Sequence, residues 1–91
     1  MYQLRISPKA SKFFKKIKDK NLKTVFKNAL EQILADPYVG ELKKGDLAGI
    51  YCYDIYHNKT NYEIAYTIII EDEVHIVIIL AGTRENFYNE L

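Results

Sequence analysis

The sequence contains few of the residues that build a covalent or metal-bound framework. Its 91 residues include a single cysteine, Cys52, which excludes an intramolecular disulfide and favours a reducing compartment. The two histidines, His57 and His75, are not clustered with that cysteine, so we expect no metal site. The sequence also lacks a glycine-rich phosphate loop, a nucleophile elbow and a zinc signature. We therefore expect a protein without a disulfide, a metal or another cofactor.

Long apolar runs are missing as well. The longest runs, 65–70 and 76–81, are far too short to span a membrane, and no signal peptide is recognisable after Met1. We expect a cytoplasmic protein with no membrane partner. The chain is 48% hydrophobic and 27% charged, which is enough to pack a core, and its length predicts a single domain over residues 1–91.

The formal net charge of +1 is unevenly distributed along the chain. Residues 1–30 carry nine Lys or Arg residues against one Asp, a charge of +8, whereas residues 31–91 carry a charge of −7. A one-sided basic field is suited to a nucleic acid or an acidic peptide. The same lysines could equally form a solvated face of two helices, and charge patterning alone does not decide between the two.

The hydrophobic pattern predicts an α+β fold with the order β-α-α-β-β-β-α. Residues 2–6 alternate as in a strand. Ser7 and Pro8 are typical of a helix start, and a second helix over 22–34 is ended by Asp36-Pro37. Three strands over 50–56, 62–70 and 74–80 should form an antiparallel meander packed on the helical hairpin. A short helix is expected after Thr83.

The long strand over 62–70 has two different faces. One face is an apolar row that should pack on the helices, because strand side chains alternate between the two sides of a sheet. The other face is smaller and more polar, and we expect it to leave an open, shallow surface. The apolar row consists of Tyr62, Ile64, Tyr66, Ile68 and Ile70, and the polar row of Glu63, Ala65 and Thr67.

Three stretches resemble the RelE/ParE toxin superfamily. They are Gly-Asp-Leu-Ala-Gly-Ile-Tyr over 45–51, Asn-Tyr-Glu-Ile-Ala-Tyr over 61–66, and Ala-Gly-Thr-Arg-Glu-Asn-Phe-Tyr over 81–88. The resemblance implies a toxin of a type II toxin–antitoxin system, bound by an antitoxin of the RelB or ParD kind. RelE-like members cut messenger RNA in the ribosomal A site without a metal, and ParE-like members inhibit DNA gyrase.

The resemblance also implies a chemistry for RelE-like members. The 2′-hydroxyl of the RNA attacks the adjacent phosphate, which requires a base, an acid for the leaving group and cations for the developing charge. RelE-like enzymes usually carry lysines on the second strand and an arginine on the third. Here the matching positions are Asp54, Tyr56 and Glu63, so carboxylates replace cations on a surface that would have to bind RNA.

Arg84 is the first candidate for a catalytic residue, because its guanidinium matches phosphate oxygens and stays charged. It could instead form a structural ion pair with a nearby carboxylate. Tyr88 is a candidate leaving-group acid or stacking platform, and could otherwise simply pack the last helix. Glu63 is a candidate general base, and the alternatives are a solvent-facing strand glutamate or a contact with the antitoxin.

Three further residues are candidates for RNA binding. Lys43 and Lys44 lie in the loop before the second strand and could add positive potential, and Tyr56 could stack on a base. Aromatic residues at such positions also stabilise sheets by cross-strand pairing. The sequence leaves three functions open: a ribosome-dependent endoribonuclease, a gyrase inhibitor or other toxin without nuclease chemistry, and a degenerate binding module.

Overall fold

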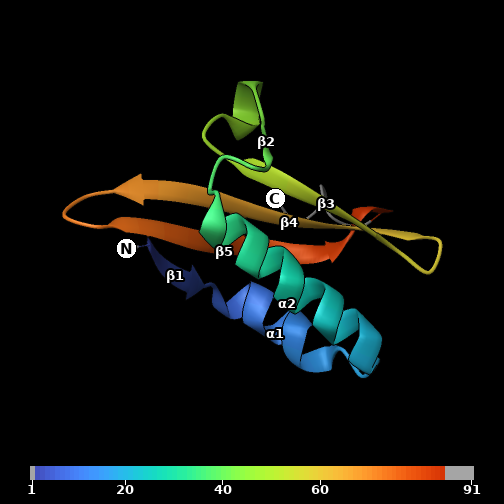
Figure 1. The fold of residues 1–91 in the computed structure, drawn as a ribbon. Helices are drawn as coiled ribbons and strands as arrows, with labels where there is room; N and C mark the ends of the chain where they lie inside the picture. Colours follow the sequence, from blue (N-terminus) through green and yellow to red (C-terminus); the bar gives the residue numbers. More distant parts are fainter. Residues whose placement is uncertain (1, 86–91) are drawn as a thin grey trace.

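One mixed β-sheet with two helices against one of its faces makes up the fold (Figure 1). The computed structural model describes residues 2–85. In chain order the elements are β1 (Tyr2–Ile6), α1 (Pro8–Lys16), α2 (Lys20–Ala35), β2 (Glu41–Leu42), the 3-10 helix η1 (Gly45–Leu47), β3 (Tyr51–His57), β4 (Thr60–Ile70) and β5 (Val74–Thr83). The helix expected after Thr83 lies almost entirely outside the described residues.

Both predicted helices are confirmed, and each begins at a capping side chain. The Ser7 hydroxyl accepts a hydrogen bond from the Ala10 amide at 3.1 Å and donates one to the Ile79 carbonyl at 2.6 Å. Ser7 therefore caps α1 and also attaches its start to β5. Asp19 caps α2 by accepting from the Asn21 amide at 2.8 Å. No helix among residues 2–85 is long and apolar enough to cross a membrane.

The sheet has the strand order β1-β5-β4-β3-β2. The predicted antiparallel meander of β3, β4 and β5 is confirmed. The sheet as a whole is not purely antiparallel, because β1 pairs in parallel with β5, with Tyr2 beside Val74 and Ile6 beside Ile78. The short strand β2, which pairs with β3, was not predicted, since two residues are too few to show alternation.

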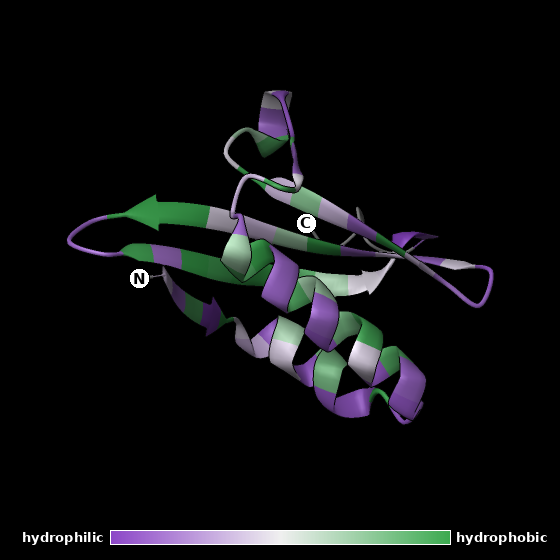
Figure 2. Cartoon of the chain, viewed as in Figure 1, coloured by the Kyte–Doolittle hydropathy of each residue, from purple (hydrophilic) through white to green (hydrophobic). Residues whose placement is uncertain are grey.

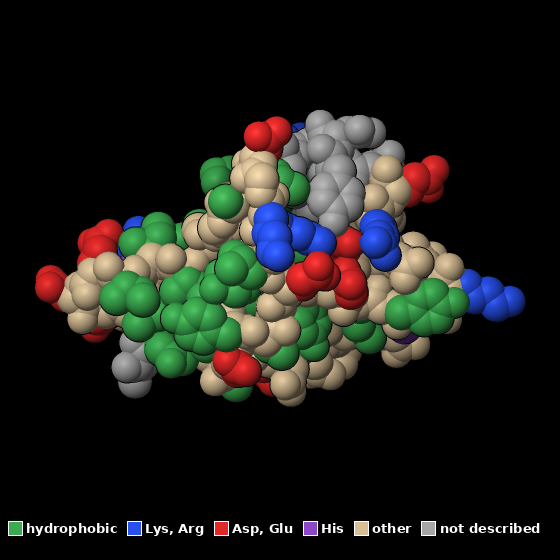
Figure 3. Space-filling model, turned by 90° about the horizontal axis from the view of Figure 1, so that it is seen from above, with side chains coloured by type: hydrophobic (Ala, Val, Ile, Leu, Met, Phe, Trp, Pro, Cys, Tyr) green, Lys and Arg blue, Asp and Glu red, His purple; other side chains and the backbone are tan. Residues whose placement is uncertain are grey.

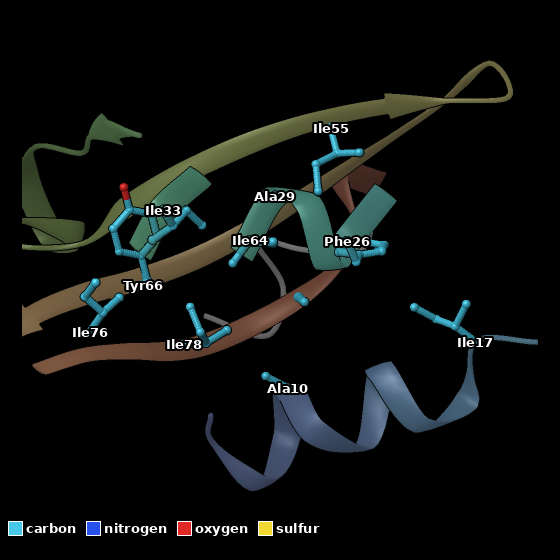
Figure 4. Close-up of a cluster of buried hydrophobic side chains, with 11 residues drawn as sticks. Ala10, Ile17, Phe26, Ala29, Ile33, Ile55, Ile64, Tyr66, Ile76 and Ile78 are labelled. Atoms are coloured by element: carbon cyan, nitrogen blue, oxygen red, sulfur yellow. The ribbon is translucent and has the colours of Figure 1, made fainter. Parts of the chain in front are cut away.

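The hydrophobic core lies between the helices and the sheet (Figure 4). The Phe26 ring of α2 lies 5.5 Å from the rings of both Phe13 and Tyr62. As predicted, the apolar row of β4 faces this core, except that Ile70 is 68% exposed beside the turn at the tip of the hairpin. Figure 2 shows β4 and β5 as largely hydrophobic strands. The buried core residues are Ala10, Ile17, Phe26, Ala29, Ile33, Ile55, Ile64, Tyr66, Ile76, Ile78 and Ala81.

The opposite face of the sheet is not the open surface that the sequence predicted. Glu63 and Ala65 are buried there, at 1% and 0% exposure, and Cys52, Ala65 and Leu80 form a second apolar cluster. The loop before β3 folds back toward the sheet, because the Thr67 hydroxyl donates to the Gly49 carbonyl at 2.9 Å. A pattern of alternation shows which side chains share a face, but it does not show what covers that face.

Candidate functional site

The candidate site is a cluster of two carboxyl groups and one arginine on the face of the sheet that lies opposite the helices. Asp54 of β3 and Glu63 of β4 are direct cross-strand partners. The Arg84 Nε atom, immediately after β5, lies 3.4 Å from Glu63 Oε1. We call Asp54, Glu63 and Arg84 the carboxyl–arginine cluster. Its members come from three adjacent strands or their ends, so the register of the sheet sets their spacing.

That register is fixed by the tight turn between β3 and β4. Asn58 and Lys59 both have positive φ angles, 49° and 63°, as in the turns whose twist matches a two-residue hairpin. The turn places His57 opposite Thr60 and, three residues further along, Asp54 opposite Glu63. On the other side of β4, an extra residue in β5 between Leu80 and Ile78 shifts the pairing at Ala65 and Tyr66. Such bulges commonly re-aim side chains near functional sites.

The two carboxyl groups differ strongly in their exposure. Asp54 is exposed, whereas the Glu63 side chain is only 2% exposed. Burial raises the pKa of Glu63, and the hydrogen bond and negative charge of Asp54 raise it further, while Arg84 and Lys43 act in the opposite direction. Two carboxyl groups this close do not both ionise readily. The pKa of Glu63 is therefore raised, and its protonated form can share a hydrogen bond with Asp54.

Arg84 is ion-paired but not enclosed. Its side chain is 58% exposed, so the guanidinium covers Glu63 while much of it still faces solvent. A partly exposed arginine over a buried carboxyl of raised pKa is an arrangement found at functional sites. The structural ion pair considered from the sequence thus exists, and its geometry leaves the cation accessible to a ligand.

The other predicted site residues lie at different distances from this cluster. Lys43 is close enough to lower the pKa of Glu63, and its Nζ lies 3.7 Å from Glu41 Oε2. Tyr56 is 69% exposed and lies on the same face of β3 as Asp54. Lys44 is exposed in the loop, and no contact brings it to the cluster. Tyr88 lies outside the described residues.

The buried Cys52 thiol is next to this cluster but is not suited to nucleophilic chemistry. Burial raises its pKa to about 11, and the negative charge of Glu63 adds to the effect, so the reactive thiolate form is disfavoured.

Within residues 2–85 no group of three or more His, Cys, Asp or Glu side chains is arranged to hold a metal ion. Figure 3 shows acidic and basic side chains gathered side by side in the middle of one face, beside a broad apolar area.

The sequence matches one family model over almost its whole length. Residues 4–91 match the family model described as a ParE-like toxin of type II bacterial toxin–antitoxin systems. The chain belongs to this toxin family. The match covers nearly the whole sequence, including the carboxyl–arginine cluster, and it confirms the resemblance drawn from the three sequence stretches. No curated protein matches the sequence.

Solved structures show the same fold for the toxin. The isolated RelE toxin of E. coli is 23% identical, with a TM-score of 0.70 over 99% of this chain and 94% of RelE. The toxin in the intact E. coli RelBE toxin–antitoxin complex is 23% identical, with a TM-score of 0.67 over 90% and 95% of the two chains. The matching chain of the RelBE2 toxin–antitoxin complex of Mycobacterium tuberculosis is 24% identical, with a TM-score of 0.69 over 91% of this chain and 98% of that chain. These likenesses confirm the predicted α+β fold.

The raised pKa of Glu63 predicts how the stability of the toxin depends on pH. The folded state holds the Glu63 proton more tightly than the unfolded chain, where the pKa has its ordinary value of 4.5. The free energy of unfolding should therefore decrease as the pH rises from about 4.5 through the raised value. Glu63→Gln should remove this part of the decrease, as measured by urea unfolding across a pH series. Glu41→Gln is the control, because Glu41 is 74% exposed in its side chain, and an unchanged slope in Glu63→Gln would contradict the prediction.

Proposed function

We propose that this toxin arrests growth by cutting messenger RNA on the ribosome, and that an antitoxin binds it and blocks the cut. The observation that carries the proposal is the accessible Arg84 guanidinium beside a pair of carboxyl groups, in which burial raises the pKa of Glu63. The antitoxin is supported by the family and by the two structurally similar toxins that were solved in complexes with their antitoxins.

The carboxyl–arginine cluster can supply most of what metal-free RNA cleavage needs. Asp54, the exposed carboxyl, takes the proton of the attacking 2′-hydroxyl, and Glu63 beneath it holds Asp54 in place through the shared hydrogen bond. Arg84 turns toward the phosphate and neutralises the charge that develops on its oxygens. This assignment moves the role of base from Glu63, the residue predicted from the sequence, to Asp54, because the Glu63 oxygens are buried. Tyr88 remains a predicted leaving-group acid.

A second function is favoured by a different observation on the same face. Asp54, Glu63 and Glu41 place negative charge where RNA would have to bind, and among residues 2–85 it is Arg84 and Lys43 that oppose this charge near the cluster. Like charges oppose the binding of a polyanion. A toxin acting on a protein target such as DNA gyrase, without nuclease chemistry, would tolerate this charge.

One set of assays with the purified toxin separates the two functions. The toxin is added to a translation extract with a defined messenger RNA, and cleavage positions are mapped by primer extension. It is also added to DNA gyrase in a supercoiling assay. Cuts within codons that depend on active ribosomes, with unchanged supercoiling, are the expected result. Intact messenger RNA together with inhibited supercoiling would replace the proposal with the second function.

A further inference from the structure

A groove lined by three lysines lies between α1 and the end of β5. It has a volume of about 490 Å³ and is bordered by Lys9, Lys12 and Lys16 on one side and by residues 80–83 of β5 on the other. Phe13 contributes an apolar side chain to the same groove. The lining of the groove on the β5 side ends at Thr83, the residue before Arg84.

The three lysines form one row along the helix. Their spacing of three and four residues places them on the same face of α1, and the rise of an α-helix puts Lys9 and Lys16 about 10 Å apart along the axis. All three side chains belong to exposed residues, and none of them forms an ion pair within residues 2–85. The row is therefore a local concentration of positive charge that no ion pair within the described residues neutralises.

The other wall of the groove is a stretch of β5 that pairs with β4 on one side and has no strand partner within residues 2–85 on the side of α1. β1 pairs with β5 only as far as Ile78, and α1 begins at Pro8, tied to β5 through Ser7. Between residues 80 and 83, no strand of the described chain pairs with β5 on the side of α1. The groove thus combines a lysine row with an unpaired strand edge, and that edge ends at Thr83, next to Arg84 in the chain.

We propose that Lys9, Lys12 and Lys16 form a track for the phosphate backbone of a single RNA strand, which leads that strand to Arg84. The inference rests on the proposed function and adds where the RNA lies on the toxin. Lysines bind phosphates as mobile point charges and need no base sequence. The track also offsets the repulsion between the RNA and the carboxyl groups of Asp54 and Glu63, because most of the attraction for RNA comes from lysines outside the carboxyl–arginine cluster.

The test measures RNA binding without relying on cleavage. A fluorescent single-stranded RNA of about 12 nucleotides is titrated with the toxin between about 50 and 200 mM salt, a range over which phosphate contacts weaken strongly. The variant K9Q/K12Q/K16Q removes the row, and glutamine keeps the helix propensity of lysine nearly unchanged. The matched control K15Q/K18Q/K20Q removes the same charge from positions that do not line the groove.

The expected result is a decrease in the salt slope of about 2 for K9Q/K12Q/K16Q, from three lost contacts at about 0.7 each, and a clearly smaller decrease for the control. Equal losses in both variants would reduce the effect to net charge and overturn the track. Unchanged RNA binding in K9Q/K12Q/K16Q would overturn the track as well. A fluorescent Glu-rich peptide is titrated in parallel. If K9Q/K12Q/K16Q loses binding of this peptide but not of the RNA, the groove is a peptide site and the track is overturned. If the toxin cuts no messenger RNA yet shows the expected slopes, the proposed cleavage fails while the track stands.

Discussion

Replacing Arg84 with alanine is expected to lower the rate of messenger RNA cleavage by about 10²–10³-fold, the usual loss when one group that stabilises developing charge is removed. The Arg84 side chain is 58% exposed and its Nε atom lies 3.4 Å from Glu63, so it is an accessible cation beside the carboxyl pair. The rate is measured in a translation extract, and growth arrest is measured on induced expression in cells. Messenger RNA cleavage and growth arrest should be lost together in Arg84→Ala.

A control arginine and a second variant separate catalysis from stability. Arg5→Ala removes an exposed arginine of β1, outside the carboxyl–arginine cluster, and should leave the cleavage rate unchanged. Arg84→Ala also takes away the charge that lowers the pKa of Glu63, so urea unfolding of the variant is measured to show whether the fold keeps its stability. Arg84→Lys should recover part of the rate, since lysine retains the charge but not the fork of donors. Wild-type rates in Arg84→Ala would remove Arg84 from the mechanism.

Gly40→Ala is expected to destabilise the toxin by about 2–4 kcal/mol, through overpacking and the disturbance of buried hydrogen bonds. A Cβ atom at Gly40 would lie 2.6 Å from the Tyr66 hydroxyl oxygen and 3.0 Å from the Cys52 carbonyl oxygen. The Tyr66 hydroxyl donates to the Pro37 carbonyl at 2.7 Å and accepts from the Gly40 amide at 2.9 Å. These bonds attach the segment that carries β2 and Lys43 to the core of the sheet.

Urea unfolding measures this loss, and two variants control it. Gly82→Ala should be nearly neutral, because a Cβ atom there would meet nothing within 4 Å. The double variant Gly40→Ala with Tyr66→Phe should cost less than the sum of the two single changes, since removing the hydroxyl also removes the closest clash. Strict additivity, or an equal cost at Gly82 and Gly40, would contradict the account of this contact.

The local pattern of the sequence predicted the helices and strands well wherever interactions between neighbouring residues determine the structure. Ser7 and the Asp36-Pro37 pair mark helix ends through hydrogen bonds and backbone geometry that involve only neighbouring residues. The parallel pairing of β1 with β5 joins segments about 70 residues apart. Nothing in the alternation of Tyr2–Ile6 specifies that partner.

The candidate site could be predicted only in part. The family stretches identified Arg84 and Glu63, but the sequence left an ion pair and a free arginine as alternatives. Spacing alone did not show the buried position of Glu63, because alternation shows which side chains share a face of the sheet and not what covers that face. The signal that could have found the carboxyl pair is the two-residue turn at Asn58-Lys59, since that turn sets Asp54 opposite Glu63.

The chemical form of the cut RNA ends shows whether the 2′-hydroxyl of the RNA is the attacking group. If the carboxyl–arginine cluster activates the 2′-hydroxyl of the RNA, the upstream fragment ends in a 2′,3′-cyclic phosphate and the downstream fragment begins with a 5′-hydroxyl. Both ends can be read by enzymatic labelling of fragments from a translation extract treated with the toxin, with Arg84→Ala as the blank. Cyclic phosphate and 5′-hydroxyl ends, absent from the blank, are the predicted result. Fragments with 3′-hydroxyl and 5′-phosphate ends, or the same fragments in the blank, would contradict it.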